Sequence, residues 1–204
     1  MKKNTFILLL SILTICFIIF VFLINSSYLT TFDNYVYNFI YSFNSSYITS
    51  FYKIITFFGS TFFILLISII IFVLYKKNRG GQNIVILLLI TIITNNILKL
   101  IIRRPRPELI NIVTENTYSF PSGHSMAIMS LVGVLLIELW SRDIINKKGF
   151  KIVLSILLIL LAILVMISRI YLGAHFASDI LGSIIVSSII LIIYYYLRCK
   201  YTKK

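Results

Sequence analysis

Six long apolar runs, separated by short polar or basic segments, dominate this sequence of 204 residues. A helix needs about 20 mostly apolar residues to cross the hydrocarbon core of a bilayer. Only 12% of the residues are charged, about half the share in a typical soluble domain, so a water-soluble globule and a disordered chain are both excluded. The runs predict an all-α bundle of six transmembrane helices, over residues 6–24, 54–75, 84–102, 122–140, 152–168 and 175–197.

The chain is expected to form a single domain over residues 1–204, because no internal repeat and no linker rich in proline or glycine divides it. The first run is predicted to be an uncleaved helix. Its apolar core is longer than that of a signal peptide, and no small-residue cleavage site follows at residues 25–27. Cys16 and Cys199 do not suggest a disulfide framework.

The basic residues indicate how the helices are oriented. The formal net charge is +13, but the lysines and arginines flank apolar runs, which is typical of membrane spans and not of a nucleic-acid-binding surface. Thirteen of the 19 fall on one side, which the positive-inside rule places in the cytoplasm with both termini. The six on the other side are Lys53, Lys99, Arg103, Arg104, Arg106 and Arg169.

The outer connection over residues 25–53 is rich in aromatic side chains at helical spacing. This pattern predicts a short helix lying in the outer membrane interface, where an aromatic belt would anchor it. A part in substrate recognition is the less favoured alternative. The residues that carry the pattern are Phe32, Tyr35, Val36, Tyr37, Phe39, Tyr41 and Phe43.

Three polar clusters lie at span ends, over residues 99–107, 120–125 and 168–179. The third predicted span ends on the outer side, the fourth begins there, and the fifth and sixth are joined there. The topology therefore brings all three clusters to one face at one depth. Ionisable residues in such positions are costly, so they mark a functional site.

The residue types in these clusters suit a phosphate group. Lys99, Arg106 and Arg169 are fixed cations, and the arginine fork matches phosphate oxygens. Ser122 and Gly123 stand at a predicted helix N-terminus, where backbone N–H groups favour an anion. The clusters thus predict a phosphate cradle.

Both histidines of the chain fall in the same clusters. His175 and Asp179 are four residues apart and would share one face of a helix. The carboxylate can then hold one ring nitrogen as N–H and leave the other as a nucleophile. His124 can act as the general acid for the leaving oxygen.

The spacing of these residues resembles that of the type-2 phosphatidic acid phosphatase family. The resemblance lies in Lys99-x6-Arg106-Pro107, Pro121-Ser122-Gly123-His124 and Ser168-Arg169-x5-His175-x3-Asp179. It implies that Lys99, Arg106, Ser122, Gly123 and Arg169 bind the phosphoryl group. It also implies that His175 forms a phosphohistidine, Asp179 orients it, and His124 serves as acid and then as base for water. Soluble vanadium haloperoxidases are similar in the anion cradle.

The resemblance implies an integral membrane lipid phosphatase with its site on the outer face of the cell membrane. Its substrate would be a lipid phosphate or pyrophosphate from the bilayer: undecaprenyl pyrophosphate, phosphatidylglycerophosphate or phosphatidic acid. We expect no cofactor and no metal, because no two acidic residues form a ligand cluster such as D-x-D.

The motif residues are compatible with more than one activity. A phosphotransferase would use the same residues, and an anion or lipid transporter is a third, less favoured alternative because such sites lie near the bilayer midplane. The oligomeric state and the roles of Arg103 and Arg104 are undetermined. Glu108 and Glu115 are expected to be loop surface rather than site residues.

Overall fold

The computed structural model describes residues 1–24, 26–75, 79–108, 112–113, 115–141 and 147–201, and these residues form helices and loops with no strand. The all-α prediction is therefore confirmed for this part of the chain. The elements in order are α1 (Lys3–Leu23), α2 (Ser27–Tyr41), α3 (Ser46–Ile55), η1 (Thr56–Gly59), α4 (Thr61–Tyr75), α5 (Arg79–Ile102), α6 (Gly123–Ser141), α7 (Lys148–Tyr171) and α8 (Ala177–Tyr201).

Five of the helices are long and apolar enough to cross a membrane: α1, α5, α6, α7 and α8. Their bounds lie within a few residues of the predicted spans, because apolar runs of this length are compatible with little besides a membrane helix. The count rises to six when a bent helix pair is taken as one span.

That bent pair contains the residues predicted as the second span, 54–75, and begins earlier in the chain, at Ser46. Residues 46–59 form α3 and η1, and α4 follows at an angle of 44°. Ser60 causes the break: its backbone is extended, and its Oγ atom accepts a hydrogen bond from the N–H of Phe63, as in an N-cap. Gly59 at the bend lets the chain approach α6 closely, because a Cβ atom there would lie 3.1 Å from the Cβ of His124.

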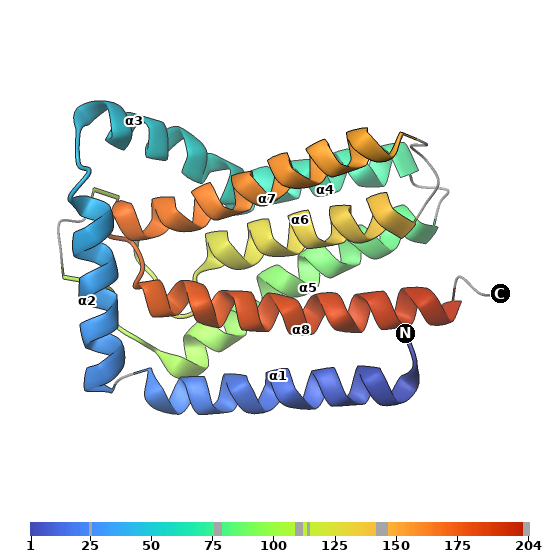
Figure 1. Ribbon diagram of the computed structural model, residues 1–204, viewed down its shortest axis with the longest axis horizontal. Helices are drawn as coiled ribbons and strands as arrows, with labels where there is room; N and C mark the ends of the chain where they lie inside the picture. The colour runs from blue at the N-terminus through green and yellow to red at the C-terminus, as the bar shows by residue number, and fades with distance from the viewer. Residues whose placement is uncertain (25, 76–78, 109–111, 114, 142–146, 202–204) are drawn as a thin grey trace.

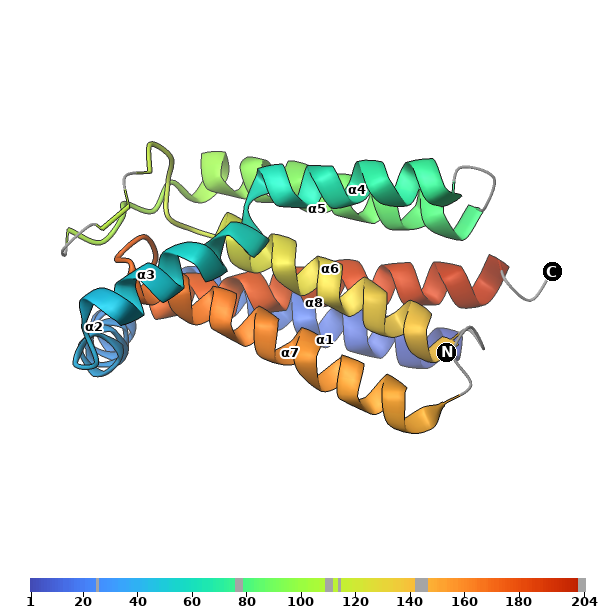
Figure 2. The same ribbon diagram turned by 90° about the horizontal axis from the view of Figure 1, so that it is seen from above.

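The long helices run side by side, whereas α2 crosses one end of the bundle (Figures 1 and 2). The start of α1 and the end of α8 lie at the opposite end. The predicted helix within residues 25–53 is therefore present, and its buried side chains are Asp33 and Tyr37. Its place in the membrane interface, like the cytoplasmic location of both termini, stays a prediction.

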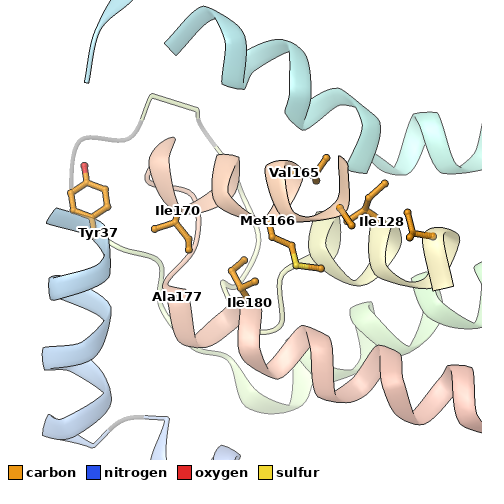
Figure 3. Close-up of a cluster of buried hydrophobic side chains, with 9 residues drawn as sticks. Tyr37, Ile128, Val165, Met166, Ile170, Ala177 and Ile180 are labelled. Atoms are coloured by element: carbon orange, nitrogen blue, oxygen red, sulfur yellow. The ribbon is translucent and has the colours of Figure 1, made fainter. Parts of the chain in front are cut away.

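A buried apolar cluster links α2 to the ends of α6, α7 and α8 (Figure 3). Tyr37 and Ile170 lie at the end nearest α2, and Ile128, Val165 and Met166 continue the cluster along the bundle. Contacts of this kind hold the loop-bearing end of the bundle together, next to the polar clusters.

Candidate active site

The first polar cluster begins where α5 ends. Arg103 adopts a left-handed conformation (φ 51°), which is unusual for a residue other than glycine, and it turns the chain immediately after the helix. The turn directs Arg104 and Arg106 toward the other loops. Lys99, in the last turn of α5, is buried and donates to Thr117 Oγ1 at 3.0 Å and to the carbonyl of Tyr118 at 2.7 Å.

The second cluster forms the start of α6. Ser122 is fully buried, and its Oγ atom accepts hydrogen bonds from the backbone N–H and the hydroxyl of Ser125 at 3.4 and 3.0 Å. This is an N-cap arrangement, which orients the first N–H groups of the helix toward the loop end. A Cβ atom on Gly123 would lie 3.1 Å from Oδ1 of Asn95, so α5 and α6 meet closely here.

The third cluster is a tight reversal between α7 and α8. Gly173 has a φ of 71°, and the N–H groups of Ala174 and His175 both donate to the carbonyl of Arg169, at 3.1 and 3.2 Å. A positive φ of this kind commonly ends a helix. The reversal brings His175 back beside Arg169.

The sequence interpretation placed His175 and Asp179 on one helix face, and this is wrong in detail. His175 lies before α8, which begins at Ala177. Asp179, in the first helical turn, instead accepts the N–H of Phe176 at 2.9 Å, as the acidic residue of a capping box does. The two side chains still meet, with His175 Nδ1 3.5 Å from Asp179 Oδ2.

An acidic residue from the intervening loop joins the two arginines of the site. Glu115 Oε1 accepts a short hydrogen bond from Arg169, and its Oε2 lies 3.7 Å from Nη2 of Arg106. The expectation that Glu115 is loop surface is therefore wrong, whereas Glu108 is exposed as expected. Burial alone would raise the pKa of Glu115, but Arg169 and Arg106 outweigh it and hold that pKa below its ordinary value.

Arg106 connects this carboxylate to the histidine. Its guanidinium donates to the carbonyls of Thr117 and Ala174, at 2.5 and 2.7 Å, and Nη1 lies 3.5 Å from Nε2 of His175. Its Nη2 atom shares Thr117 Oγ1 with Lys99. The three predicted cations thus surround one small region.

His175 itself is 2% exposed. Burial, together with the charges of Arg169, Arg106 and Lys99, holds its pKa well below the ordinary value of 6.5, so the ring is neutral at pH 7. Its Nδ1 atom faces Asp179 and its Nε2 atom faces Arg106. A proton on Nδ1 would leave the lone pair of Nε2 directed at the cationic region.

His124, the second residue of α6, is partly buried and interacts electrostatically with all four of these groups: Lys99, Arg106, Arg169 and His175. Ser122 and Gly123 instead contact Asn95, Ser125 and Ser183. The structure therefore gathers the predicted cations and histidines, with Ser122 and Gly123 supplying the helix start beneath them.

Arg104 was missed as a site residue by sequence reasoning. It is 6% exposed and bonds Asp179, Asp33 and Ser178 behind the histidine. Asp33, the single acidic residue in the aromatic 25–53 segment, was the available signal. A carboxylate buried among aromatic side chains requires a cationic partner, which could have pointed to a buried arginine.

A pocket of about 770 Å³ opens beside these groups, within the range common for small-ligand sites. Lys99, Arg106 and Glu115 line one part of it, and Leu100, which is 64% exposed on α5, lines another. The pocket therefore connects the cations to the apolar outer surface of the bundle. Among the described residues, no three His, Cys, Asp or Glu side chains are grouped as a metal site would require.

Fold and site together define a multi-pass α-helical membrane protein with a cationic, histidine-containing centre at one end of its bundle. The sequence model of the PAP2 superfamily matches residues 81–203, which include all three motifs. The chain therefore belongs to the PAP2 superfamily, the type-2 phosphatidic acid phosphatases that its motifs resemble.

Individual relatives agree with this assignment. Phosphatidylglycerophosphatase B of Bacillus subtilis (strain 168) is 42% identical over 86 residues, a match that spans 42% of this chain and 42% of that protein. The crystal structure of a transmembrane PAP2-type phosphatidylglycerolphosphate phosphatase from Bacillus subtilis aligns with a TM-score of 0.85 and 26% identity, over 94% of this chain and 96% of that one. Aquifex aeolicus LpxE shares the fold, with a TM-score of 0.60 and 23% identity over 81% of this chain and 93% of its own.

Proposed function

We propose that this protein hydrolyses the terminal phosphate of a membrane lipid through a phosphohistidine on His175, at the outer face of the cell membrane. The observation that carries the proposal is the position of the Glu115 carboxylate between Arg106 and Arg169. A planar anion held between these arginines is a small stand-in for a phosphoryl group, and Nη1 of Arg106 lies 3.5 Å from Nε2 of His175.

In the proposed reaction, the phosphoryl group displaces the Glu115 carboxylate and is held by Arg106, Arg169 and Lys99. The neutral Nε2 of His175 attacks phosphorus, while Asp179 keeps the proton on Nδ1 and stabilises the cationic ring as it forms. His124 donates a proton to the leaving lipid oxygen. It then removes a proton from the water that releases inorganic phosphate and restores His175.

The arginines and Lys99 supply the charge stabilisation that phosphoryl transfer needs. We therefore propose that turnover requires no metal and no other cofactor. The pocket supports a lipid substrate, because it joins the cations to the apolar surface beside Leu100. The Bacillus relatives named for phosphatidylglycerophosphate favour that lipid over undecaprenyl pyrophosphate and phosphatidic acid.

Phosphate release by the detergent-purified protein, in EDTA, tests the proposal. The panel holds phosphatidylglycerophosphate, phosphatidic acid and undecaprenyl pyrophosphate, and wild type is compared with His175→Ala. We expect release by wild type alone, fastest from phosphatidylglycerophosphate. Equal release by the variant would contradict the nucleophile, and loss of wild-type release in EDTA would contradict metal independence.

The panel also separates the alternatives. Consumption of the lipid with phosphate recovered on a second lipid would indicate a phosphotransferase built on the same site. No consumption of any lipid by folded wild-type protein would contradict the phosphatase and favour a transporter.

A further inference from the structure

A chain of charged side chains extends from the site toward α2. Arg104 donates through Nη1 to Oδ1 of Asp179 at 2.6 Å and through Nη2 to Oδ2 of Asp33 at 2.9 Å. We infer that Asp33, acting through Arg104 and Ser178, is a positioning residue that holds Asp179 in register with His175. The inference rests on the proposed function, since it assigns Asp33 a part in the same reaction.

The two oxygens of Asp179 have separate partners. Oδ1 is bound by Arg104, whereas Oδ2 accepts the N–H of Phe176 and faces His175 Nδ1. Because each of its two oxygens accepts a hydrogen bond, the Asp179 carboxylate is held in a single orientation. Arg104 therefore determines which edge of Asp179 the histidine meets.

Asp33 fixes both the arginine and the start of α8. Its Oδ1 accepts the backbone N–H of Ser178 at 2.7 Å, and its Oδ2 accepts the Ser178 hydroxyl at 2.6 Å. The same hydroxyl accepts a 2.7 Å hydrogen bond from Arg104. A side chain of α2 thus caps the first turn of α8, one residue before Asp179.

Burial makes this arrangement demanding. The side chains of Asp33, Arg104 and Asp179 are 1%, 5% and 0% exposed, and the Phe176 ring covers the guanidinium at 4.1 Å. A buried charge left without its partner is strongly unfavourable. Because both carboxylates are buried, water cannot take the place of Arg104 as their partner. Loss of the Asp33 charge leaves Arg104 with one carboxylate in place of two and frees its position.

Arg104 lines the pocket together with Lys99 and Arg106, whereas Asp33 is not among the pocket's lining residues. Within the part of the chain that the structure describes, the hydrogen bonds of Asp33 go to Arg104 and Ser178. The effect of Asp33 should therefore fall on the chemical step and not on phosphate affinity. Asp33→Asn keeps the shape of the side chain and removes its charge. Asn34→Ala, at the adjacent exposed position of α2, is the matched control.

We would measure kcat on phosphatidylglycerophosphate, the inhibition constant of inorganic phosphate, and thermal stability, for both variants. We expect Asp33→Asn to lower kcat about tenfold or more with the phosphate inhibition constant within about twofold of wild type. Asn34→Ala should match wild type in all three. An unchanged kcat in folded Asp33→Asn would overturn the inference.

A double-mutant cycle separates positioning from general destabilisation. If Asp33 acts through Asp179, Asp33→Asn should have no further effect in an Asp179→Asn background. If Asp33→Asn lowered kcat by the same factor in both backgrounds, the inference would be overturned. If Asp33→Asn does not fold, Arg104→Lys is the test. Lysine keeps the positive charge but cannot bond Asp179 and Asp33 through two separate nitrogen atoms. A wild-type kcat in Arg104→Lys would overturn the inference.

Failure of the proposed function has a different signature. In that case His175→Ala retains turnover, whatever Asp33→Asn does. If His175→Ala is inactive and Asp33→Asn behaves as wild type, only the positioning role of Asp33 is contradicted.

Discussion

Oδ2 of Asp179 lies 3.5 Å from Nδ1 of His175, and the two side chains are 0% and 2% exposed. This separation is longer than a good hydrogen bond, and Nδ1 has no hydrogen-bond partner among the described residues. Such contacts often tighten only when substrate binds. If His175 is the nucleophile as proposed, this contact should shorten when a phosphoryl group is bound.

Asp179→Asn tests that relationship. The amide keeps the shape of the carboxylate but cannot stabilise the cationic ring that forms during attack, so we expect kcat to fall about 10²- to 10⁴-fold. Phosphate release from phosphatidylglycerophosphate measures the effect. The kcat of His175→Ala should fall further, because that change removes the proposed nucleophile itself. A greater loss in Asp179→Asn than in His175→Ala would contradict the assignment.

Glu115→Gln tests whether the resident carboxylate competes with phosphate. Removal of its charge should strengthen the binding of inorganic phosphate, with an inhibition constant about tenfold lower, since an anion would no longer have to displace an anion. Glu108→Gln removes the same charge from an exposed position of the same loop and serves as the control. Weaker phosphate binding in Glu115→Gln would mean that Glu115 instead orders the arginines for substrate.

Gly59→Ala tests the close contact at the bend before α4. The added methyl would lie 2.6 Å from Cγ1 of Val165 and 3.1 Å from the Cβ of His124. We expect a loss of about 1–3 kcal/mol in the free energy of unfolding, together with a lower kcat as His124 shifts. Gly149→Ala, where an added methyl meets nothing within 4 Å, is the control and should keep wild-type activity.

The pH dependence of kcat/KM tests the state of His175. In the proposed mechanism the neutral ring is the nucleophile, so activity should be present above the pKa of His175 in the folded protein and lost as pH falls through it. Because that pKa is lowered, the acid limb should lie below the ordinary histidine value of 6.5. The charged groups that act on the ring are Arg169, Arg106, Lys99, Glu115 and Asp179.

Arg106→Gln provides the comparison. Removal of this cation should raise the pKa of His175 and move the acid limb upward, in addition to weakening phosphate binding. Ionisation of the substrate is common to both enzymes and cancels when the two profiles are compared. Coincident acid limbs would contradict the assignment of that limb to His175.

The sequence predicted the parts of this protein that depend on local pattern. Apolar runs predicted the long helices, and the order of the spans brought Lys99, Arg106, Arg169 and His175 to one end. These predictions succeed because a membrane span depends on length and composition alone. The bend at Ser60 was not predicted, since a single serine can end one helix and begin the next while the sequence around it stays apolar.

The roles of Arg104 and Glu115 were not predictable in the same way. Whether a charged loop residue is buried depends on partners far away in the chain: Arg104 pairs with Asp33 across 71 positions, and Glu115 with Arg169 across 54. Neither residue belongs to the motifs, and each looks like ordinary loop surface in isolation. Only the assembled bundle distinguishes them from the exposed Arg103 and Glu108.

His175 is proposed to carry the phosphoryl group during turnover. Rapid alkaline quenching of wild-type protein with phosphatidylglycerophosphate, followed by peptide mapping by mass spectrometry, would detect that group. We predict a phosphohistidine at position 175 in the wild-type protein and none in His175→Ala. A phosphoryl group on His124, or turnover by a protein that never becomes phosphorylated at position 175, would contradict the role of His175.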